Sequence, residues 1–291
     1  MKVRRDSAML AAAVVFSLVP FSLGAQTPQT GAASTTPATP AATTPAATTP
    51  AAAKPPANAK EAAPEDLTGQ WMAVVTEDWR YRMILPPKND YAGVPMTFAG
   101  KKIADSWDAA KDEASGQQCK SYGAPAVMRT PGRIRISWAD EDTLKVEADA
   151  GTQTRLFYFK EPKSQGGDWQ GRSQATWETR ATRNGTGGNN FGGGTNPPPE
   201  VPKPPALSGS LQVVTTKLKP GYLRKNGVAY SDKTVLTEYY DRTKEPNGDS
   251  WLVVKTIVYD PVYLSQEFIT SSHFKKQNDQ SGWNPTPCSS R

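Results

Sequence analysis

The plainest β-hairpin signal in the chain reads VLTEYYDR (235–242), EPNG (245–248) and WLVVKTIVY (251–259). Polar and apolar residues alternate on both arms, and β-branched and aromatic residues are enriched, as in half-buried strands. Asn247 and Gly248 favour the positive φ of a tight turn. The stretch predicts two antiparallel strands joined by a short turn.

The same alternation recurs outward from this hairpin. Parallel neighbours need crossovers of about a dozen residues, so the short connections between the expected strands favour an antiparallel sheet. The predicted fold is all-β: a lipocalin-like antiparallel barrel, which removes exposed edges, or a two-layer sandwich. Trp71, Trp138 and Trp251 are expected in its core. The further strands are expected at 70–76, 133–138, 143–148, 153–159, 173–178, 211–218 and 269–275.

One segment departs from the strand pattern. Residues 97–114 place Phe98, Ile103 and Trp107 near helical spacing among charged residues. Such spacing predicts one amphipathic helix laid on the sheet or across a barrel mouth.

The first 25 residues have the plan of a secretory signal peptide. Basic residues open the chain, and an apolar run from Ala8 to Leu23 follows. This run is short for a helix that must span a bilayer core of about 30 Å, so an uncleaved anchor is the weaker alternative. We expect cleavage after Ala25, no transmembrane segment in the mature chain, and a location in the periplasm or outside the cell.

Composition divides the mature chain. Residues 26–64 are dominated by Ala, Thr and Pro, with almost nothing to bury, so a disordered tether is expected. The β domain is expected at 65–284, interrupted by a disordered Gly- and Pro-rich loop at 182–206. Residues 285–291 form a C-terminal tail.

Charge and cysteine content narrow the partners. The formal net charge of +6 is spread along the chain, which argues against nucleic acid. Cys119 and Cys288 are the only cysteines, and in an oxidising compartment we expect them to pair and stabilise the fold by about 5 kcal/mol. Two unpaired thiols are the alternative. Two cysteines and one histidine are too few for a metal site, and no cofactor is expected.

Residues 79–83, Trp-Arg-Tyr-Arg-Met, alternate as a strand would. Arg80 and Arg82 would then share one face and Tyr81 the other. Two arginines at this spacing could grip an acidic head group through bidentate hydrogen bonds. A solvated basic edge is the alternative interpretation.

Further candidate ligand-binding residues are Tyr222, Arg224, Tyr239 and His273. As a general base, the single histidine would need a neighbouring serine and an orienting carboxylate. No catalytic residue is predicted, because the sequence alone does not bring such groups together. Asp232, Asp241 or Asp260 could orient this histidine if the fold brings one of them close.

Motif-like stretches cover most of the chain beyond the tether: DLTGQW (66–71), RTPGR (129–133), QTRLF (153–157), WQGRS (169–173), LQVVTT (211–216), LTEYYDR (236–242) and residues 254–261. In these stretches the chain resembles a family of uncharacterised exported bacterial proteins that are predicted to be lipocalin-like. The resemblance implies a barrel and transfers no activity. The chain departs from the family in its 182–206 insertion and its long tether.

The predicted function is an exported, tethered barrel that holds a small apolar or amphipathic ligand in the cell envelope. Two alternatives stay open. One is an envelope interaction or structural protein with a filled core, and the other is a hydrolase or isomerase that uses the same cavity. An enclosed space between the strands would favour the ligand carrier, and a filled interior would favour the interaction protein.

Overall fold

The computed structural model describes residues 56–181 and 207–290. The predicted signal peptide, the predicted disordered loop and most of the predicted tether lie outside them. Residues 56–64, the end of that tether, are described and contact the barrel. Ala59 is only 9 % exposed, and its carbonyl accepts a hydrogen bond from Trp177 Nε1 at 2.8 Å.

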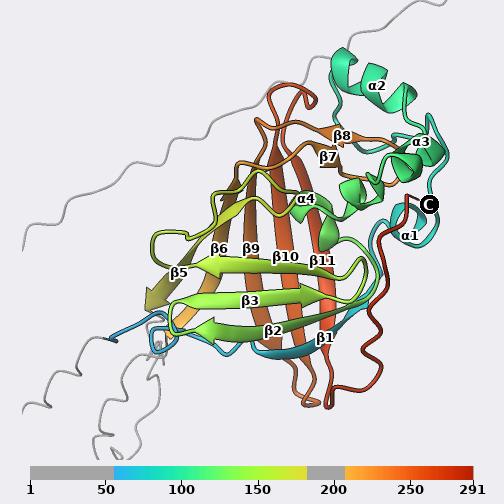
Figure 1. The fold of residues 1–291 in the computed structure, drawn as a ribbon. Helices are drawn as coiled ribbons and strands as arrows, with labels where there is room; N and C mark the ends of the chain where they lie inside the picture. The colour runs from blue at the N-terminus through green and yellow to red at the C-terminus, as the bar shows by residue number, and fades with distance from the viewer. Residues whose placement is uncertain (1–55, 182–206, 291) are drawn as a thin grey trace, which may run out of the picture. The chain divides into compact units, whose positions relative to one another are not determined.

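The fold is a closed nine-strand barrel, as the strand pattern predicts, and not a sandwich (Figure 1). Around the barrel the strands follow the order β1-β11-β10-β9-β6-β5-β4-β3-β2. Their bounds are β1 Gly69–Val74, β2 Arg133–Asp140, β3 Thr143–Ala148, β4 Gln153–Tyr158, β5 Arg172–Ala181, β6 Leu207–Thr216, β9 Val235–Lys244, β10 Ser250–Tyr259 and β11 Phe268–Lys276.

One strand pair breaks the antiparallel rule. β4 and β5 are parallel where Phe157 pairs with Ser173, whereas every other neighbouring pair in the described barrel is antiparallel. The prediction of an antiparallel sheet throughout is therefore wrong at this point. Residues 159–171 connect the two strands and are long enough for the crossover that a parallel pair requires.

The β9–β10 hairpin is confirmed, with Tyr259 paired to Val235 at one end. Only Gly248 of the predicted turn pair has a positive φ, of 90°. The Asn247 side chain contributes differently, because its Oδ1 accepts a hydrogen bond from the backbone N–H of Asp249 at 2.9 Å. Side-chain hydrogen bonding of this kind is a common way for asparagine to close a turn.

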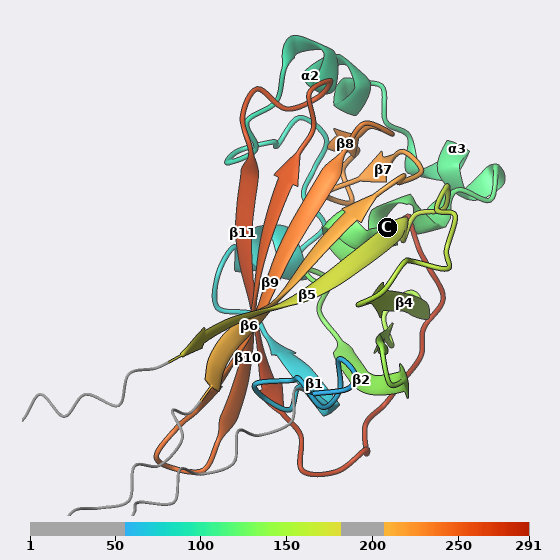
Figure 2. The same ribbon diagram turned by 90° about the vertical axis from the view of Figure 1, so that its left-hand side faces the viewer.

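Short helices and a small second sheet gather at the end of the barrel where β10 ends and β11 begins (Figures 1 and 2). The second sheet is the two-stranded pair β7–β8, which the sequence pattern did not reveal. We call this assembly the cap. Its elements are α1 Trp79–Met83, α2 Phe98–Asp105, α3 Ala109–Ala114, the 3-10 helix η1 Gln118–Tyr122, α4 Ala124–Val127, β7 Gly221–Tyr222 and β8 Ala229–Tyr230.

The predicted helix at 97–114 is two helices, α2 and α3. The break has a local cause: the Asp108 carboxylate accepts hydrogen bonds from the backbone N–H groups of Ala110 and Lys111, and so caps a new helix. The predicted strand at 79–83 is wrong, because these residues form α1. Residues two apart in a helix lie about 200° apart, so α1 places Arg80 and Arg82 on opposite faces, whereas the predicted strand would place them on the same face.

Side chains of the strands themselves fill the barrel. Trp71, Phe157, Tyr240 and Phe274 are at most 1 % exposed and pack in one cluster with aliphatic side chains from the surrounding strands. Trp71 confirms its predicted place, and Trp138 lies at the margin of this cluster. Trp251 lies half-buried beside the fully buried Leu252, so its predicted core position is wrong.

A charged pair lies inside the same barrel. Arg155 on β4 and Glu238 on β9 are 2 % and 0 % exposed and form two hydrogen bonds of 2.9 and 2.6 Å. The Tyr240 hydroxyl donates to the same carboxylate at 3.2 Å. Despite its burial, the charge of Glu238 raises the pKa of Arg155 above its ordinary value. The two side chains therefore compensate each other's charge within the barrel.

The predicted disulfide is confirmed. Cys119 in η1 is bonded to Cys288, across a sequence separation of 169 residues. The disulfide holds the C-terminal segment against the cap. A second contact holds the same segment, since the backbone N–H of Thr286 donates to the Asp149 carbonyl at 2.9 Å.

Candidate functional site

A pocket of about 210 Å³ lies in the cap, between α1, α4 and the segment that joins β7 to β8. Its apolar wall includes Met83, Ile84, Leu85, Ala126, Pro131 and Leu223. Three arginines line the rest: Arg82 from α1, Arg129 just after α4, and Arg224 just after β7. The pocket thus combines an apolar side with a strongly basic one.

The three arginines are buried, at 9 %, 5 % and 5 % exposure for Arg82, Arg129 and Arg224. Each also has one buried guanidinium nitrogen without a hydrogen-bond partner among the described residues: Nη2 of Arg82, Nη1 of Arg129 and Nε of Arg224. A buried donor that bonds to nothing costs free energy. All three arginines line the pocket, and this concentration of positive charge makes it complementary to an anion.

Carboxylates compensate only part of this charge. Glu77 pairs with Arg82, and Asp78 pairs with Arg129 at 3.0 Å. Among the described residues no carboxylate lies within ion-pair distance of Arg224. Its guanidinium instead donates to the Ala92 carbonyl and lies over the Tyr81 ring, 4.1 Å from the centroid.

Burial and the neighbouring charge of Arg129 disfavour the charged forms of Arg82 and Arg224, and so lower their pKa values. Burial lowers the pKa of Arg224, and the neighbouring charge of Arg129 lowers it further. Burial also lowers the pKa of Arg82; Glu77 opposes that shift, whereas Arg129 adds to it. An anion among the three guanidinium groups would relieve the repulsion.

The pocket mouth is apolar and open to solvent. Met83, Ile84 and Leu85 are 60 %, 55 % and 42 % exposed. Large apolar side chains that are consecutive and exposed mark a contact surface more often than isolated ones do. We call these three residues the apolar rim.

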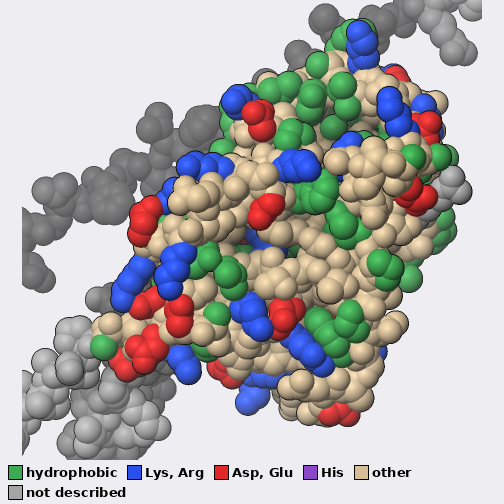
Figure 3. All heavy atoms as spheres, in the orientation of Figure 1, with side chains coloured by type: hydrophobic (Ala, Val, Ile, Leu, Met, Phe, Trp, Pro, Cys, Tyr) green, Lys and Arg blue, Asp and Glu red, His purple; other side chains and the backbone are tan. Residues whose placement is uncertain are grey.

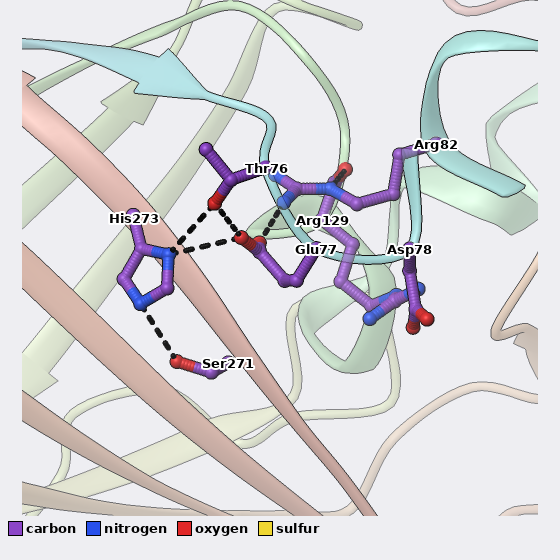
Figure 4. A network of polar contacts seen from close by, with 7 residues as sticks. All are labelled: Thr76, Glu77, Asp78, Arg82, Arg129, Ser271 and His273. Atoms are coloured by element: carbon purple, nitrogen blue, oxygen red, sulfur yellow. Dashed lines mark hydrogen bonds and ion pairs between the residues drawn. The ribbon is translucent and has the colours of Figure 1, made fainter. Parts of the chain in front are cut away.

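Behind Arg82 lies a hydrogen-bonded network that ends on β11 (Figure 4). The Glu77 carboxylate accepts from the Thr76 hydroxyl at 2.8 Å and lies 2.9 Å from Nδ1 of His273. On the other side of the imidazole, Nε2 lies 3.4 Å from the Ser271 hydroxyl. Burial opposes the lowering, but the bonds from Thr76 and the backbone and the charge of Arg82 hold the pKa of Glu77 below its ordinary value.

The structure brings together three of the predicted ligand-binding residues. Tyr81 and Arg82 line the same pocket as Arg224, which is far from them in the sequence. Arg80 does not join them: it points to solvent, with 62 % of its side chain exposed, and pairs with Asp90 at 2.8 Å. Its predicted partnership with Arg82 is therefore absent.

The remaining predicted residues lie elsewhere. The Tyr222 hydroxyl donates to Asp112 at 2.8 Å in the cap. Tyr239 lies half-buried on β9, where its hydroxyl accepts from the Gln212 amide at 2.9 Å. His273 contacts the pocket only indirectly, through Glu77.

Two residues of the site are absent from the sequence prediction. Arg129 follows a buried helix, and nothing in its local pattern indicates that it lies next to Arg82. The carboxylate that orients His273 is Glu77. β1 pairs Val74 with His273, and Glu77 follows Val74 by three residues, so its side chain lies next to the imidazole. The three aspartates named in the sequence analysis make other contacts. Asp260 accepts a hydrogen bond from the Thr234 hydroxyl, Asp241 accepts one from the Ser210 hydroxyl, and Asp232 forms an ion pair with Lys233.

On the face drawn in Figure 3, basic and acidic side chains are interspersed. No group of metal-ligating side chains occurs in the described parts of the chain. Within the same residues, no helix has the length and apolar character needed to cross a bilayer. Comparison with protein-family models, with curated proteins and with solved structures finds no match.

Proposed function

We propose that this protein binds a small amphiphilic anion in the cap pocket. The acidic head group would bind to Arg82, Arg129 and Arg224, and its apolar part would lie against the rim. The observation that carries the proposal is the presence of three buried guanidinium groups, each with an unpartnered nitrogen, around one pocket.

A head group with several acceptor oxygens suits the three guanidinium groups. Phosphate, sulfonate and carboxylate oxygens accept charge-assisted hydrogen bonds, which are about twice as strong as neutral ones. Arginine binds such groups through its planar fork. Among the described residues Arg224 has no ion-pair partner, and the more distant charges of Asp78 and Asp90 only partly oppose the lowering of its pKa, so a bound anion would supply a direct counterion.

The size of the pocket limits what it can enclose. At about 210 Å³ it is smaller than the roughly 300–1,000 Å³ of pockets that bury a drug-sized ligand. It suits a head group with a few carbon atoms. A longer chain would leave through the mouth and cover the exposed side chains of Met83, Ile84 and Leu85.

The proposed ligand site differs from the barrel interior that the sequence predicts. Because Trp71, Phe157 and Phe274 occupy the interior, the proposed cargo lies in the cap rather than between the strands. The disulfide supports the proposal that the chain works in an oxidising compartment, in the periplasm or outside the cell. A filled interior also favours the alternative of an envelope interaction protein, which the binding test addresses.

Isothermal titration with alkyl phosphates of two to eight carbons tests the proposal. We expect saturable binding that tightens about fourfold for each methylene that contacts the rim, as expected for about 0.8 kcal/mol per buried CH₂. Arg224→Met should weaken binding by about 10- to 150-fold, the equivalent of a lost charged hydrogen bond of about 1.5–3 kcal/mol.

The matched control is Arg80→Met, because this arginine belongs to the same region but points to solvent. It should leave the affinity unchanged. Absence of binding across the series, or equal losses in both variants, would reject the pocket and favour the interaction protein.

A further inference from the structure

Ser271, His273 and Glu77 form a hydrogen-bonded chain on the outside of the barrel (Figure 4). The Ser271 hydroxyl lies 3.4 Å from His273 Nε2, and His273 Nδ1 lies 2.9 Å from Glu77 Oε2. These are the contacts that join nucleophile, base and orienting carboxylate in serine hydrolases, where a distance somewhat beyond 3.2 Å is common without substrate.

The hydrogen bonds assign the protons. An ionised Glu77 can only accept, so it selects the tautomer of His273 that carries its proton on Nδ1. The lone pair of Nε2 then faces Ser271 and can take the hydroxyl proton. Thr76 and Arg82 hold the Glu77 carboxylate from two further directions, which keeps the orienting group in place.

Strand geometry explains the arrangement. Ser271 and His273 are two apart on β11, so both project from the same face, and each is only half-buried. The side chain of Ile269, two residues earlier on that face, is 58 % exposed. Lys255 on β10 pairs in register with Ser271, but its ammonium group lies over the Tyr239 ring on β9, 4.2 Å from the centroid. The face therefore offers an apolar contact, the Ile269 side chain, on the same strand as the hydrogen-bonded chain.

The geometry points to an esterase site with Ser271 as nucleophile, His273 as general base and Glu77 as the residue that positions the base. Its substrates are small carboxylic esters whose acyl group is short and apolar, matching Ile269. This inference does not depend on anion binding in the cap, because neither Ser271 nor His273 lines that pocket.

The reaction needs only water as a second reactant. Ser271 Oγ attacks the ester carbonyl carbon while its proton moves to His273 Nε2. The bond to the alcohol oxygen then breaks, and the imidazolium returns the proton to the leaving alcohol. Water attacks the acyl-serine in the same manner and releases the carboxylic acid and the free hydroxyl.

A fluorophosphonate probe tests the assignment on the full-length protein. We expect one adduct, formed on Ser271 with loss of fluoride and located by peptide mass spectrometry. Ser271→Ala should abolish it, and His273→Gln should slow labelling at least 100-fold, within the roughly 10²–10⁴-fold contribution of a general base. Wild type and variants should also differ in the release of nitrophenol from 4-nitrophenyl acetate.

Ser265→Ala is the matched control, because Ser265 lies just before β11 and its hydroxyl donates to the Pro95 carbonyl with no histidine nearby. It should label as wild type does. The inference is wrong if Ser271 is labelled no faster than Ser265, or if a folded His273→Gln variant, checked by its melting curve, labels at the wild-type rate.

Discussion

Breaking the Arg155–Glu238 pair should cost the barrel a large part of its stability. Both side chains are almost fully buried, and both carboxylate oxygens are bonded to the guanidinium. Glu238→Gln keeps the shape but leaves the Arg155 charge without its counterion. Removing one partner of a buried pair costs about 3–5 kcal/mol.

The double variant Arg155→Met/Glu238→Leu separates charge from packing. It removes both charges, so its unfolding free energy should lie within about 2 kcal/mol of the wild type and well above that of Glu238→Gln. Urea unfolding followed by tryptophan fluorescence, with the disulfide intact, gives all the required free energies. The double-mutant cycle also needs the single variants Arg155→Met and Glu238→Leu.

A loss below about 1 kcal/mol in Glu238→Gln would refute this reasoning. It would mean that water reaches Arg155 and that the interior is not filled. The barrel itself would then again be a place for a ligand. The expected large loss instead supports the cap as the binding region.

Three further outcomes follow from the described contacts. Arg224→Met should change the unfolding free energy, measured in urea, by less than about 1 kcal/mol. The variant loses the hydrogen bond to the Ala92 carbonyl, but it also loses the repulsion between Arg224 and Arg129; a larger loss of stability would contradict this. Asp260→Asn should cost about 1.5–3 kcal/mol, since the buried carboxylate accepts from Thr234 and nearby backbone N–H groups. Burial opposes the shift, but these bonds lower the pKa of Asp260. Its contribution is therefore fully present above its unfolded value of about 3.8 and is lost as the pH falls from there through the lowered folded value; a stability difference between wild type and variant that grows as the pH falls would contradict this. Reduction of the Cys119–Cys288 bond should lower stability by about 5 kcal/mol, measured by unfolding with and without reductant, and an unchanged midpoint would show that the loop adds nothing.

The sequence predicts the barrel well because strand alternation is a local property. The hairpin at 235–259 and the turn glycine Gly248 are confirmed for that reason. The parallel β4–β5 pair could not be predicted, because the pairing depends on where a long connection returns. The split of the predicted helix was in principle visible, since Asp108 is a good capping residue.

The site was predicted only in part, for a physical reason. Arg82 and Arg224 stood out through their aromatic neighbours, and both line the pocket. Arg129 and Glu77 acquire their roles through contacts across the fold, and no local pattern carries that information. Arg80 looked equivalent to Arg82, but helical geometry turns it to solvent.

A crystal structure of the protein with octyl phosphate tests the central claim most directly. We expect phosphate oxygens about 2.7–3.1 Å from guanidinium nitrogens of Arg82, Arg129 and Arg224, with the alkyl chain along the apolar rim. Phosphate density inside the barrel, or on the surface away from these three arginines, would contradict the account.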